Sequence, residues 1–278
     1  MKRLLPLVGV AALAATLAAC GGGGGGGGGS SNNTSTSGGS AVPNPIVFCS
    51  DVTYPPEESY PTPGGAPAGS DIDIANDVAK LLGSTAQIKN TGFDGIIGAL
   101  NSKKCDAIIS GMNDTAERRK QVDFIDYLSV GQSFMVQAGN PKHITSLATA
   151  AGHTVSVEAG TTDRDFLAAQ SAKLTKAGKP AINIKTFPKD TDAAAALKAG
   201  RVDAYFGDSP VVVYYISKDK SFAVGGSPIA PIPIGIAVRK GSPLEPKIKS
   251  AINTLYSNGT IKKIVAKWGM TSAVTLLH

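Results

Sequence analysis

Residues 105–124, which read CDAIISGMNDTAERRKQVDF, determine how the rest of this sequence is interpreted. Ala107, Ile108 and Ile109 form an apolar run, which predicts a short buried strand. The run stops at Ser110-Gly111, where a glycine allows the backbone to approach another group closely. The stretch is therefore predicted to be a strand that ends in a polar turn.

Arg118 is the side chain of this stretch that we predict to bind a ligand. Thr115 could cap a helix, but a capping box needs Glu or Gln three residues later, where Arg118 stands instead. An Arg on the first turn of a helix, beside a strand end and a glycine, suits a carboxylate. The guanidinium offers a bidentate fork, and the helix N-terminus adds positive potential. From this stretch alone, the alternative is a surface Arg in a basic run.

The order of these residues resembles the signature of the family 3 extracellular solute-binding proteins, the amino-acid receptors of ABC importers. That signature is D-x-x-x-[SA]-[GS]-[ML]-x-x-T-x-x-R followed by a run ending in D-F, and residues 106–124 follow it. The resemblance implies an α/β protein with the two-lobed periplasmic-binding-protein fold (type II). It also implies that Arg118 holds the α-carboxylate of the ligand together with Ser110, and Gly111 and Asn113 complete the predicted ligand-binding residues of this turn.

Length and composition fit such a protein. The 278 residues, 42% of them hydrophobic, supply material for one or two ordinary cores, and two are expected once the N-terminal segment is set aside. The formal net charge is +6, of which Lys2 and Arg3 supply two, and the remainder forms no dense basic face. Nucleic-acid binding therefore has little support. We also expect the protein to be a monomer.

The first 44 residues predict export and attachment. A basic pair precedes an apolar segment at residues 4–17 that is too short for a membrane span. The sequence LAAC at residues 17–20 resembles the lipobox of bacterial lipoproteins, which implies a signal peptide of residues 1–19 and lipid attachment to Cys20. An ordinary secretory signal with a chance cysteine is the alternative. Residues 20–44 are uncharged and mostly Gly, Ser, Asn and Thr, which predicts a flexible tether.

The protein is accordingly predicted to be anchored on the outer face of the cell membrane or in the periplasm, with two lobes that close on a ligand. The predicted boundaries are residues 45–132 plus 235–278 for lobe 1 and residues 133–234 for lobe 2, with crossings at 134–137 and 232–238. These crossings would act as the hinge. We also expect a turn at 125–128 and a helix near 145–150.

Two aromatic residues are predicted to form the walls of the site. The apolar strand at residues 46–49 delivers Asp51 and Tyr54 beyond its end, where ligands lie in α/β sheets. Many family members have an acid and an aromatic at these two positions, so the resemblance implies that Tyr54 covers one face of the ligand. Phe93, at a helix start after a strand, would cover the other face. The alternatives are a surface loop for Tyr54 and a core position for Phe93.

Lobe 2 is predicted to supply residues for both charges of the ligand. The sequence EAGTTD begins at Glu158, and its Gly-Thr-Thr leaves free amides at a helix start, which suits an anion. It resembles the family's G-T-T motif, which implies that Thr162 helps Arg118; an ordinary strand-to-helix turn is the alternative. The run GRVDA, followed by Asp208, resembles G-R-x-D-A-x-x-x-D, whose last acid pairs with the α-ammonium, with Asp51 as second candidate. A buried zwitterion needs both charges matched.

Two further acids bear on the identity of the ligand. Glu158 and Asp163 flank the Gly-Thr-Thr turn, where the side chain of the ligand should point. Acids there favour a cationic or amide side chain over an acidic one. Alternatively, either acid is a solvated surface residue, and Asp163 serves only the helix N-terminus.

Cys49 and Cys105 both fall at strand positions in lobe 1 of an exported protein. Strands one and three of such a sheet can be neighbours, so a disulfide and a pair of buried free thiols both remain open.

An enzyme is the rival class of function. The three histidines are scattered, so no metal site is predicted, and we expect no cofactor. The sequence contains no G-x-S-x-G, H-E-x-x-H or Walker loop. We therefore predict a non-enzymatic protein that binds a free amino acid and delivers it to the membrane subunits of an ABC transporter. The alternatives are a sensor without a transport role and a dehydratase-like enzyme on the same fold.

Overall fold

The computed structural model describes residues 41–277. The predicted signal peptide, Cys20 and nearly all of the predicted tether lie outside the described residues. The described residues all belong to one compact unit. Within the described part, no helix has the length and apolar character needed to cross a membrane.

Strands and helices alternate through most of the described chain. The strands are β1 (Ile46–Ser50), β2 (Thr53–Tyr54), β3 (Glu58–Ser59), β4 (Ala86–Asn90), β5 (Ala107–Ile108), β6 (Val122–Gln137), β7 (Thr154–Glu158), β8 (Asn183–Phe187), β9 (Ala204–Asp208), β10 (Phe222–Val224), β11 (Ile229–Arg239) and β12 (Val274–Thr275). The helices are α1 (Ser70–Leu81), α2 (Ile96–Asn101), α3 (Thr162–Lys176), α4 (Asp190–Lys198), α5 (Ser209–Lys218), α6 (Glu245–Ser257) and α7 (Thr260–Lys267), with the 3₁₀ helices η1 (Phe93–Gly95) and η2 (Arg118–Lys120).

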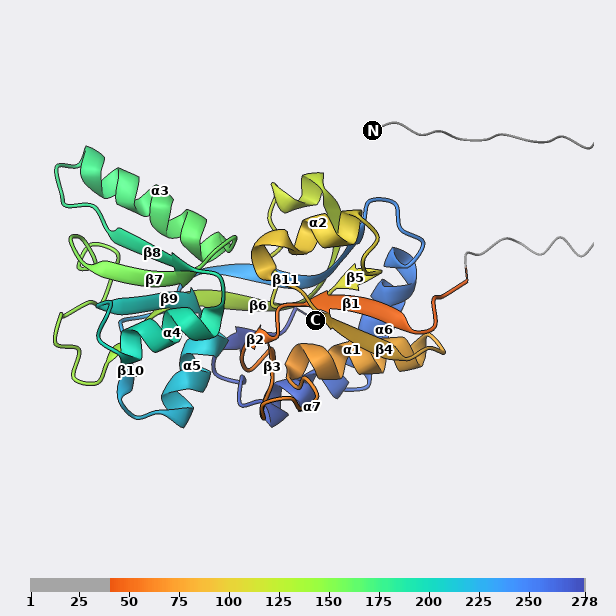
Figure 1. The fold of residues 1–278 in the computed structure, drawn as a ribbon. Helices are drawn as coiled ribbons and strands as arrows, with labels where there is room; N and C mark the ends of the chain where they lie inside the picture. Colours follow the sequence, from red (N-terminus) through yellow and green to blue (C-terminus); the bar gives the residue numbers. More distant parts are fainter. Residues whose placement is uncertain (1–40, 278) are drawn as a thin grey trace, which may run out of the picture. The chain divides into compact units, whose positions relative to one another are not determined.

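Ten of the strands form one mixed sheet. Its order is β4-β1-β5-β11-β6-β9-β7-β8, and β10 and β12 also pair with β6. The pairs β4-β1-β5 and β9-β7-β8 are parallel, whereas β11 and β6 in the middle are antiparallel. Figure 1 shows β6 and β11 running between these two parallel groups. We call β4, β1 and β5 with their helices the first end of the sheet, and β9, β7 and β8 with theirs the second end.

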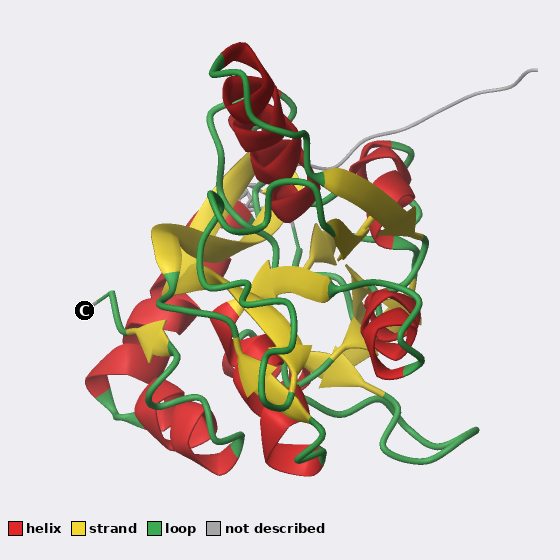
Figure 2. Ribbon diagram, turned by 90° about the vertical axis from the view of Figure 1, so that its left-hand side faces the viewer, coloured by secondary structure: helices red, strands yellow, loops and turns green. Residues whose placement is uncertain are grey.

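Helices cover both faces of the strands (Figure 2). At the first end, α1 places Ile74 and Val78, one helical turn apart, against β-strand residues such as Phe48, and α6 adds Ile248 to the same core. At the second end, a separate cluster packs Leu167 of α3 against β-strand residues including Phe206. Each end thus has apolar cores of its own, because the apolar face of every helix must be buried against another element.

The expected turn at 125–128 is wrong, because these residues lie within β6. That strand runs from Val122 to Gln137 without a break. It pairs with β11 along most of its length, with Ile125 opposite Ile236 and Leu128 opposite Ile234. Both predicted crossings therefore fall within two long, paired strands, and the exact division into lobes stays a prediction.

The expected helix near 145–150 is also wrong, because this segment forms turns. The Thr149 hydroxyl accepts hydrogen bonds from the backbone N–H groups of Thr145 and Ser146, at 2.9 Å each. Such local side-chain bonds offer the backbone an alternative to helical hydrogen bonding.

Cys49 and Cys105 form a disulfide, with their Cα atoms 5.7 Å apart. Cys49 lies in β1, and Cys105 precedes β5, which pairs with β1 in parallel. Of the two alternatives left open by the sequence, the structure therefore contains the bonded pair.

We predict that removal of this disulfide destabilises the protein without changing its fold. The bond spans 56 residues, and the loop-closure entropy of a chain of this length corresponds to about 4 kcal/mol in the unfolded state. Urea denaturation of a variant with Cys49→Ser and Cys105→Ser, compared with the oxidised protein, measures the difference. Equal midpoints for the two proteins would contradict the prediction.

Candidate functional site

The predicted ligand-binding residues follow the carboxyl ends of strands in both parts of the sheet. From the first end come Asp51 after β1, Tyr54 in β2, Phe93 in η1, Ser110, Gly111 and Asn113 after β5, and Arg118 in η2; from the second end come Glu158 at the end of β7, Thr162 and Asp163 in the first turn of α3, and Asp208 at the end of β9. Residues far apart in the sequence thus approach one another at the place where α/β proteins bind ligands.

Arg118 lies between the two ends of the sheet. Its side chain is 9% exposed, and its guanidinium donates to the backbone oxygens of Asn113 at 2.8 Å and Gly160 at 3.2 Å. The guanidinium carbon also lies 5.3 Å from the centre of the Phe93 ring. No carboxylate of residues 41–277 forms an ion pair with Arg118, so its guanidinium retains N–H donors for an anion.

The helix that the sequence predicts at Arg118 is present but short. The residue lies in the three-residue 3₁₀ helix η2, and its backbone N–H donates to the Thr115 hydroxyl at 3.1 Å. Thr115 therefore caps the turn, but no long helix contributes a dipole here. The pKa of Arg118 is lowered by burial, while the negative charges of Asp163 and Asp208 act in the opposite direction.

Tyr54 reaches from the first end to the second. Its hydroxyl accepts a hydrogen bond from the backbone N–H of Asp208 at 3.3 Å, and the residue is 7% exposed. Gly111 lies beside the ring with φ +50°, and a Cβ at this position would come within 3.1 Å of the ring. A glycine is needed here for both its backbone conformation and its lack of a side chain.

Two more contacts join the two ends. The Thr162 hydroxyl donates to the Asn113 side-chain oxygen at 2.5 Å. Gly160 packs so closely against η1 that a Cβ on it would lie 2.7 Å from the Asp94 Cα. The structure therefore has the two ends in direct contact around these residues.

Several polar atoms in this region are buried without a hydrogen-bond partner among the described residues. They include the Asn113 side-chain nitrogen and the oxygens Asp208 Oδ1, Glu158 Oε1 and Gln132 Oε1. Buried polar groups in folded proteins are nearly always paired, so these atoms require a partner that a polar ligand or water would supply.

Ser110 and Asp51 are engaged in a hydrogen-bonded network at the first end. The Ser110 hydroxyl donates to Glu58 Oε1 at 2.8 Å and accepts from the Asp51 backbone N–H at 2.9 Å. The Asp51 carboxylate accepts from the Phe93 backbone N–H at 2.8 Å and from the Thr53 hydroxyl at 2.7 Å. Phe93 is thus fixed by its backbone, beneath the Arg118 guanidinium.

Acidic side chains far outnumber basic ones among the buried ionisable residues. The buried acids are Asp51, Glu57, Glu58, Asp71, Glu158, Asp163, Asp190 and Asp208, whereas the buried basic residues of the described chain comprise Arg118 alone. Asp163 Oδ1 accepts from the Gln132 amide at 2.8 Å, and its charge acts on Arg118 and Asp208. This imbalance is unfavourable in the empty protein, because buried like charges repel and lose their hydration.

Glu57, Glu58, Asp71 and Asp190 were missed by sequence reasoning. Asp71 accepts from the Gly111 backbone N–H and the Tyr127 hydroxyl, at 2.8 and 2.7 Å, so it supports the turn before Arg118. Asp190 accepts from the Tyr205 and Tyr215 hydroxyls at 2.5 and 2.9 Å. For Asp190, the sequence offered one indication of a site residue, namely its position just beyond a short strand. For the Glu57-Glu58 pair, the sequence offered no indication of burial.

The pKa values of these acids reflect their burial. Burial raises the pKa of Asp208 to about 7, with Asp190 adding repulsion and Tyr54, Asn113 and Arg118 opposing it. Burial likewise raises the pKa of Asp190 to about 7 and that of Glu158 to about 10. The pKa of Asp163 is raised by burial and by Asp208. Perturbed titration of clustered groups is typical of functional sites.

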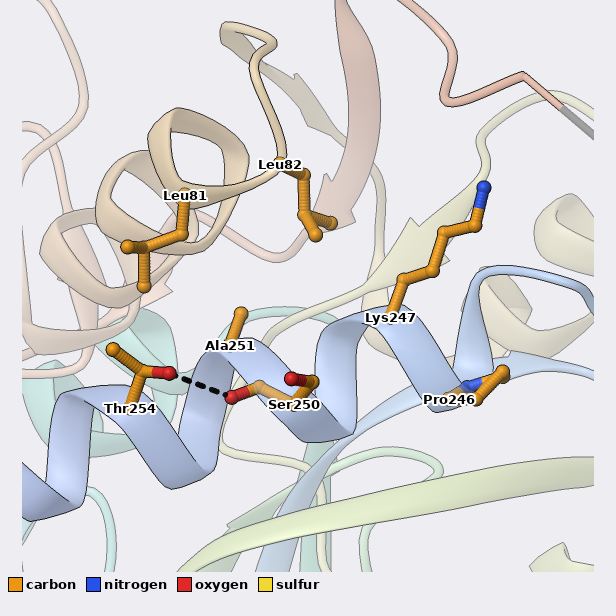
Figure 3. Close-up of a pocket in the computed structure, with 7 residues that line it drawn as sticks. All are labelled: Leu81, Leu82, Pro246, Lys247, Ser250, Ala251 and Thr254. Atoms are coloured by element: carbon orange, nitrogen blue, oxygen red, sulfur yellow. Dashed lines mark hydrogen bonds between the residues drawn. The ribbon is translucent and has the colours of Figure 1, made fainter. Parts of the chain in front are cut away.

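A cavity of about 380 Å³ lies elsewhere, between α1 and α6. Figure 3 shows Leu81 and Leu82 pointing toward Ala251 and Thr254 across it. None of the predicted ligand-binding residues lines this cavity, and its walls contain no buried charge. A zwitterion needs both of its charges compensated, and this cavity has no buried acid or base to compensate them.

Comparison with known proteins identifies the family. Residues 46–271 match the bacterial extracellular solute-binding proteins, family 3. The chain belongs to this family. Membership confirms the resemblance seen in residues 106–124, since the match extends over nearly the whole folded part.

Proteins whose names state an amino-acid ligand are similar to this chain over most of its length. The putative ABC transporter arginine-binding protein 2 of Escherichia coli is 31% identical over 80% of this chain and 90% of its own. The ABC transporter glutamine-binding protein of Bacillus subtilis is 33% identical over 72% of each chain. The solved structure of an ancestral arginine-binding protein bound to arginine is 36% identical, with a TM-score of 0.74 over 81% of this chain and 98% of that one. The predicted α/β periplasmic-binding-protein fold is thereby confirmed.

We predict that the ligand-free protein loses stability as the pH rises from 5 to 8. Asp190 and Asp208, with folded-state pKa values of about 7 against an ordinary 3.8, hold more protons when folded than when unfolded. Their stabilising contribution is complete below about pH 4 and is lost as the pH rises through about 7. Thermal melting across this range should show a falling midpoint, and Asp208→Asn should flatten the fall. A midpoint that rises between pH 5 and 8 would contradict the prediction.

Proposed function

We propose that this protein captures a single amino acid with a cationic side chain between two closing lobes and delivers it to an ABC importer. The observation that supports this most directly is the placement of Arg118 and Asp208, two buried groups of opposite charge that influence each other electrostatically without forming an ion pair among the described residues. The guanidinium of Arg118 comes from the first end of the sheet and has no ion-pair partner among the described residues, while Asp208 Oδ1 comes from the second end and has no hydrogen-bond partner there. An α-amino acid carries the two charges that this pair lacks.

The α-carboxylate would bind the free donors of Arg118. The Thr162 hydroxyl contacts the Asn113 side chain, whose amide nitrogen is unpartnered among the described residues and could donate to the same carboxylate. The Ser110 hydroxyl donates to Glu58 instead, which leaves its predicted contact with the carboxylate without support. Charge-assisted hydrogen bonds from a planar guanidinium to a carboxylate are among the strongest in proteins. The negative charge of the carboxylate would also oppose the lowering of the Arg118 pKa by burial.

The α-ammonium would bind Asp208, with the Tyr54 and Phe93 rings as walls. Asp208 is buried, and its backbone N–H donates to the Tyr54 hydroxyl, which would bring the carboxylate beside the Tyr54 ring in the closed protein. The Phe93 ring already lies against Arg118. Exclusion of water by the two rings would strengthen the polar contacts of the ligand. Asp51 is bonded to Thr53 and the Phe93 backbone, which favours Asp208 for the ammonium.

A cationic side chain suits the charge of the site better than a neutral one. The buried acids outnumber the buried Arg by far, and an arginine ligand would add one net positive charge. Relatives whose names state arginine as ligand support the same choice. Another relative is named as a glutamine-binding protein, so glutamine is the neutral ligand to compare with arginine.

Closure would follow from the division of the site between two lobes. We propose that lobe 1 comprises residues 45–132 and 235–278 and lobe 2 residues 133–234, with β6 and β11 as the hinge. The contacts Tyr54–Asp208 and Thr162–Asn113 would then be made on closing. The ligand would stabilise the closed state because only that state matches both of its charges.

Attachment through Cys20 would keep the protein beside its importer. The proposal rests on the lipobox-like LAAC sequence and the uncharged tether after it. Labelling with radioactive palmitate should be lost in Cys20→Ser and retained in Cys49→Ser. Equal labelling of both variants would contradict a lipid anchor at Cys20.

We predict that arginine stabilises the protein and that Arg118→Ala abolishes this effect. Arginine, glutamine and glutamate are each added to the protein, and the thermal midpoint is followed as the ligand concentration rises. Arginine should give the largest shift and glutamate none. Loss of a buried charge partner costs about 2–5 kcal/mol, so Arg118→Ala should weaken arginine binding at least roughly 30-fold.

Arg164→Ala is the matched control for this variant. Arg164 is exposed in the first turn of α3 and pairs only with its neighbour Asp165, so its removal changes the net charge equally without touching the site. Arg164→Ala should bind arginine as the unaltered protein does. Unaltered arginine affinity in Arg118→Ala would exclude the assigned role of Arg118, and the absence of any shift with any amino acid would exclude the proposed function.

A further inference from the structure

Gln132 is a buried polar residue that is not among the predicted ligand-binding residues. It lies within β6, where this strand passes from its pairing with β12 to its pairing with β9. The Gln132 side chain is only 1% exposed. Its position is set by a long paired strand, whereas the turns after the other strands carry the predicted site residues.

The strand register brings Gln132 next to Asp208. The two residues lie directly opposite each other in the antiparallel pair of β6 and β9. Directly opposite residues in such a pair have their side chains on the same face of the sheet, with Cβ atoms about 4.5–5.5 Å apart. Gln132 is therefore a neighbour of the acid that we propose for the α-ammonium.

The orientation of the Gln132 amide follows from its contact with Asp163 in α3. The amide nitrogen Nε2 donates to Asp163 Oδ1 at 2.8 Å. An ionised carboxylate can only accept hydrogen bonds, so the amide must turn its nitrogen toward it. The carbonyl oxygen Oε1 of Gln132 is therefore directed away from Asp163.

Two acceptor oxygens in this place have no donor. Gln132 Oε1 and Asp208 Oδ1 are both buried and have no hydrogen-bond partner among the described residues. Since buried polar atoms are nearly always paired, two unpartnered acceptors on neighbouring side chains indicate a missing group that donates more than one hydrogen bond. An ammonium group has three N–H donors and is such a group.

We propose that Gln132 is a specificity-determining residue, whose Oε1 accepts a hydrogen bond from the α-ammonium of the captured amino acid beside Asp208 while its Nε2 holds Asp163. This proposal rests on the proposed function and adds a residue of the crossing strand to it. The ammonium would then be bound by one charged and one neutral acceptor.

An amide suits this position better than a second carboxylate would. Asp163 and Asp208 already repel each other in the buried site. A carboxylate at position 132 would add a third negative charge and would lose the donor to Asp163. Gln132 supplies an acceptor and a donor without charge. A site built in this way should reject a compound that lacks the α-amino group, because its buried acceptors would stay unpaired.

The test compares arginine with 5-guanidinopentanoic acid, which is arginine without its α-amino group. Titration calorimetry measures both affinities in the unaltered protein and in Gln132→Met, which keeps an unbranched side chain but removes the amide. A hydrogen bond to a charged group is among the stronger ones, so the preference for arginine over the analogue should fall at least roughly tenfold in Gln132→Met. A merely structural role of Gln132, or a water as its partner, would weaken both compounds equally.

Gln137→Met is the matched control. It makes the same change at the end of the same strand, where the Gln137 amide donates to the Leu197 backbone oxygen at 3.3 Å. This variant should keep the preference of the unaltered protein. Gln132→Glu is a second variant that keeps an acceptor at the position, so it should also retain the preference for arginine. If Gln132→Met does not fold, a lower preference in Gln132→Glu would overturn the proposal.

The outcomes separate this proposal from the proposed function. An unchanged preference for arginine in Gln132→Met would overturn the role of Gln132 and leave the proposed function intact. Failure of the unaltered protein to bind any amino acid would instead overturn the proposed function. If the protein binds glutamine and not arginine, glutamine and 4-carbamoylbutanoic acid, which is glutamine without its α-amino group, make the same comparison.

Discussion

A charge buried in a protein interior is strongly unfavourable unless an opposite charge or hydrogen bonds compensate it, and this constraint governs the site. Arg118 is buried and has backbone oxygens but no carboxylate as partners among the described residues. Asp208 is buried at the other side of the contact between the two ends of the sheet, with one oxygen unpartnered. In the proposed function, an α-amino acid would satisfy both residues at once, and capture and closure would then be one event.

The same constraint accounts for the placement of the site residues on the fold. Parallel strands at each end of the sheet direct their carboxyl ends toward the contact region, and short turns after β1, β5, β7 and β9 carry the polar groups. Rigid strands position these groups, while the long antiparallel pair of β6 and β11 connects the two ends. Function is thus confined to loops supported by a scaffold whose cores lie elsewhere.

The fold and most of the candidate site could be predicted because they depend on local sequence. Apolar runs flanked by glycine predicted strands such as β5, and an ordered motif with several fixed positions pointed to Arg118. The missed features depend on tertiary context. Nothing local shows that Glu57 and Glu58 are buried, or that residues 125–128 continue β6 by pairing with β11. The helix predicted at 145–150 does not form because backbone N–H groups of this segment donate to the Thr149 hydroxyl instead of making helical hydrogen bonds.

The central claim is that the α-carboxylate of the ligand compensates Arg118, and comparison of arginine with agmatine tests it most directly. Agmatine is arginine without its carboxylate, so it retains both cationic groups but leaves the Arg118 guanidinium buried and unpaired. Calorimetric titration of the unaltered protein with each compound should show agmatine binding weaker by about 2–5 kcal/mol, or roughly 30-fold to 5,000-fold. Equal affinities for the two compounds would contradict this account of the site.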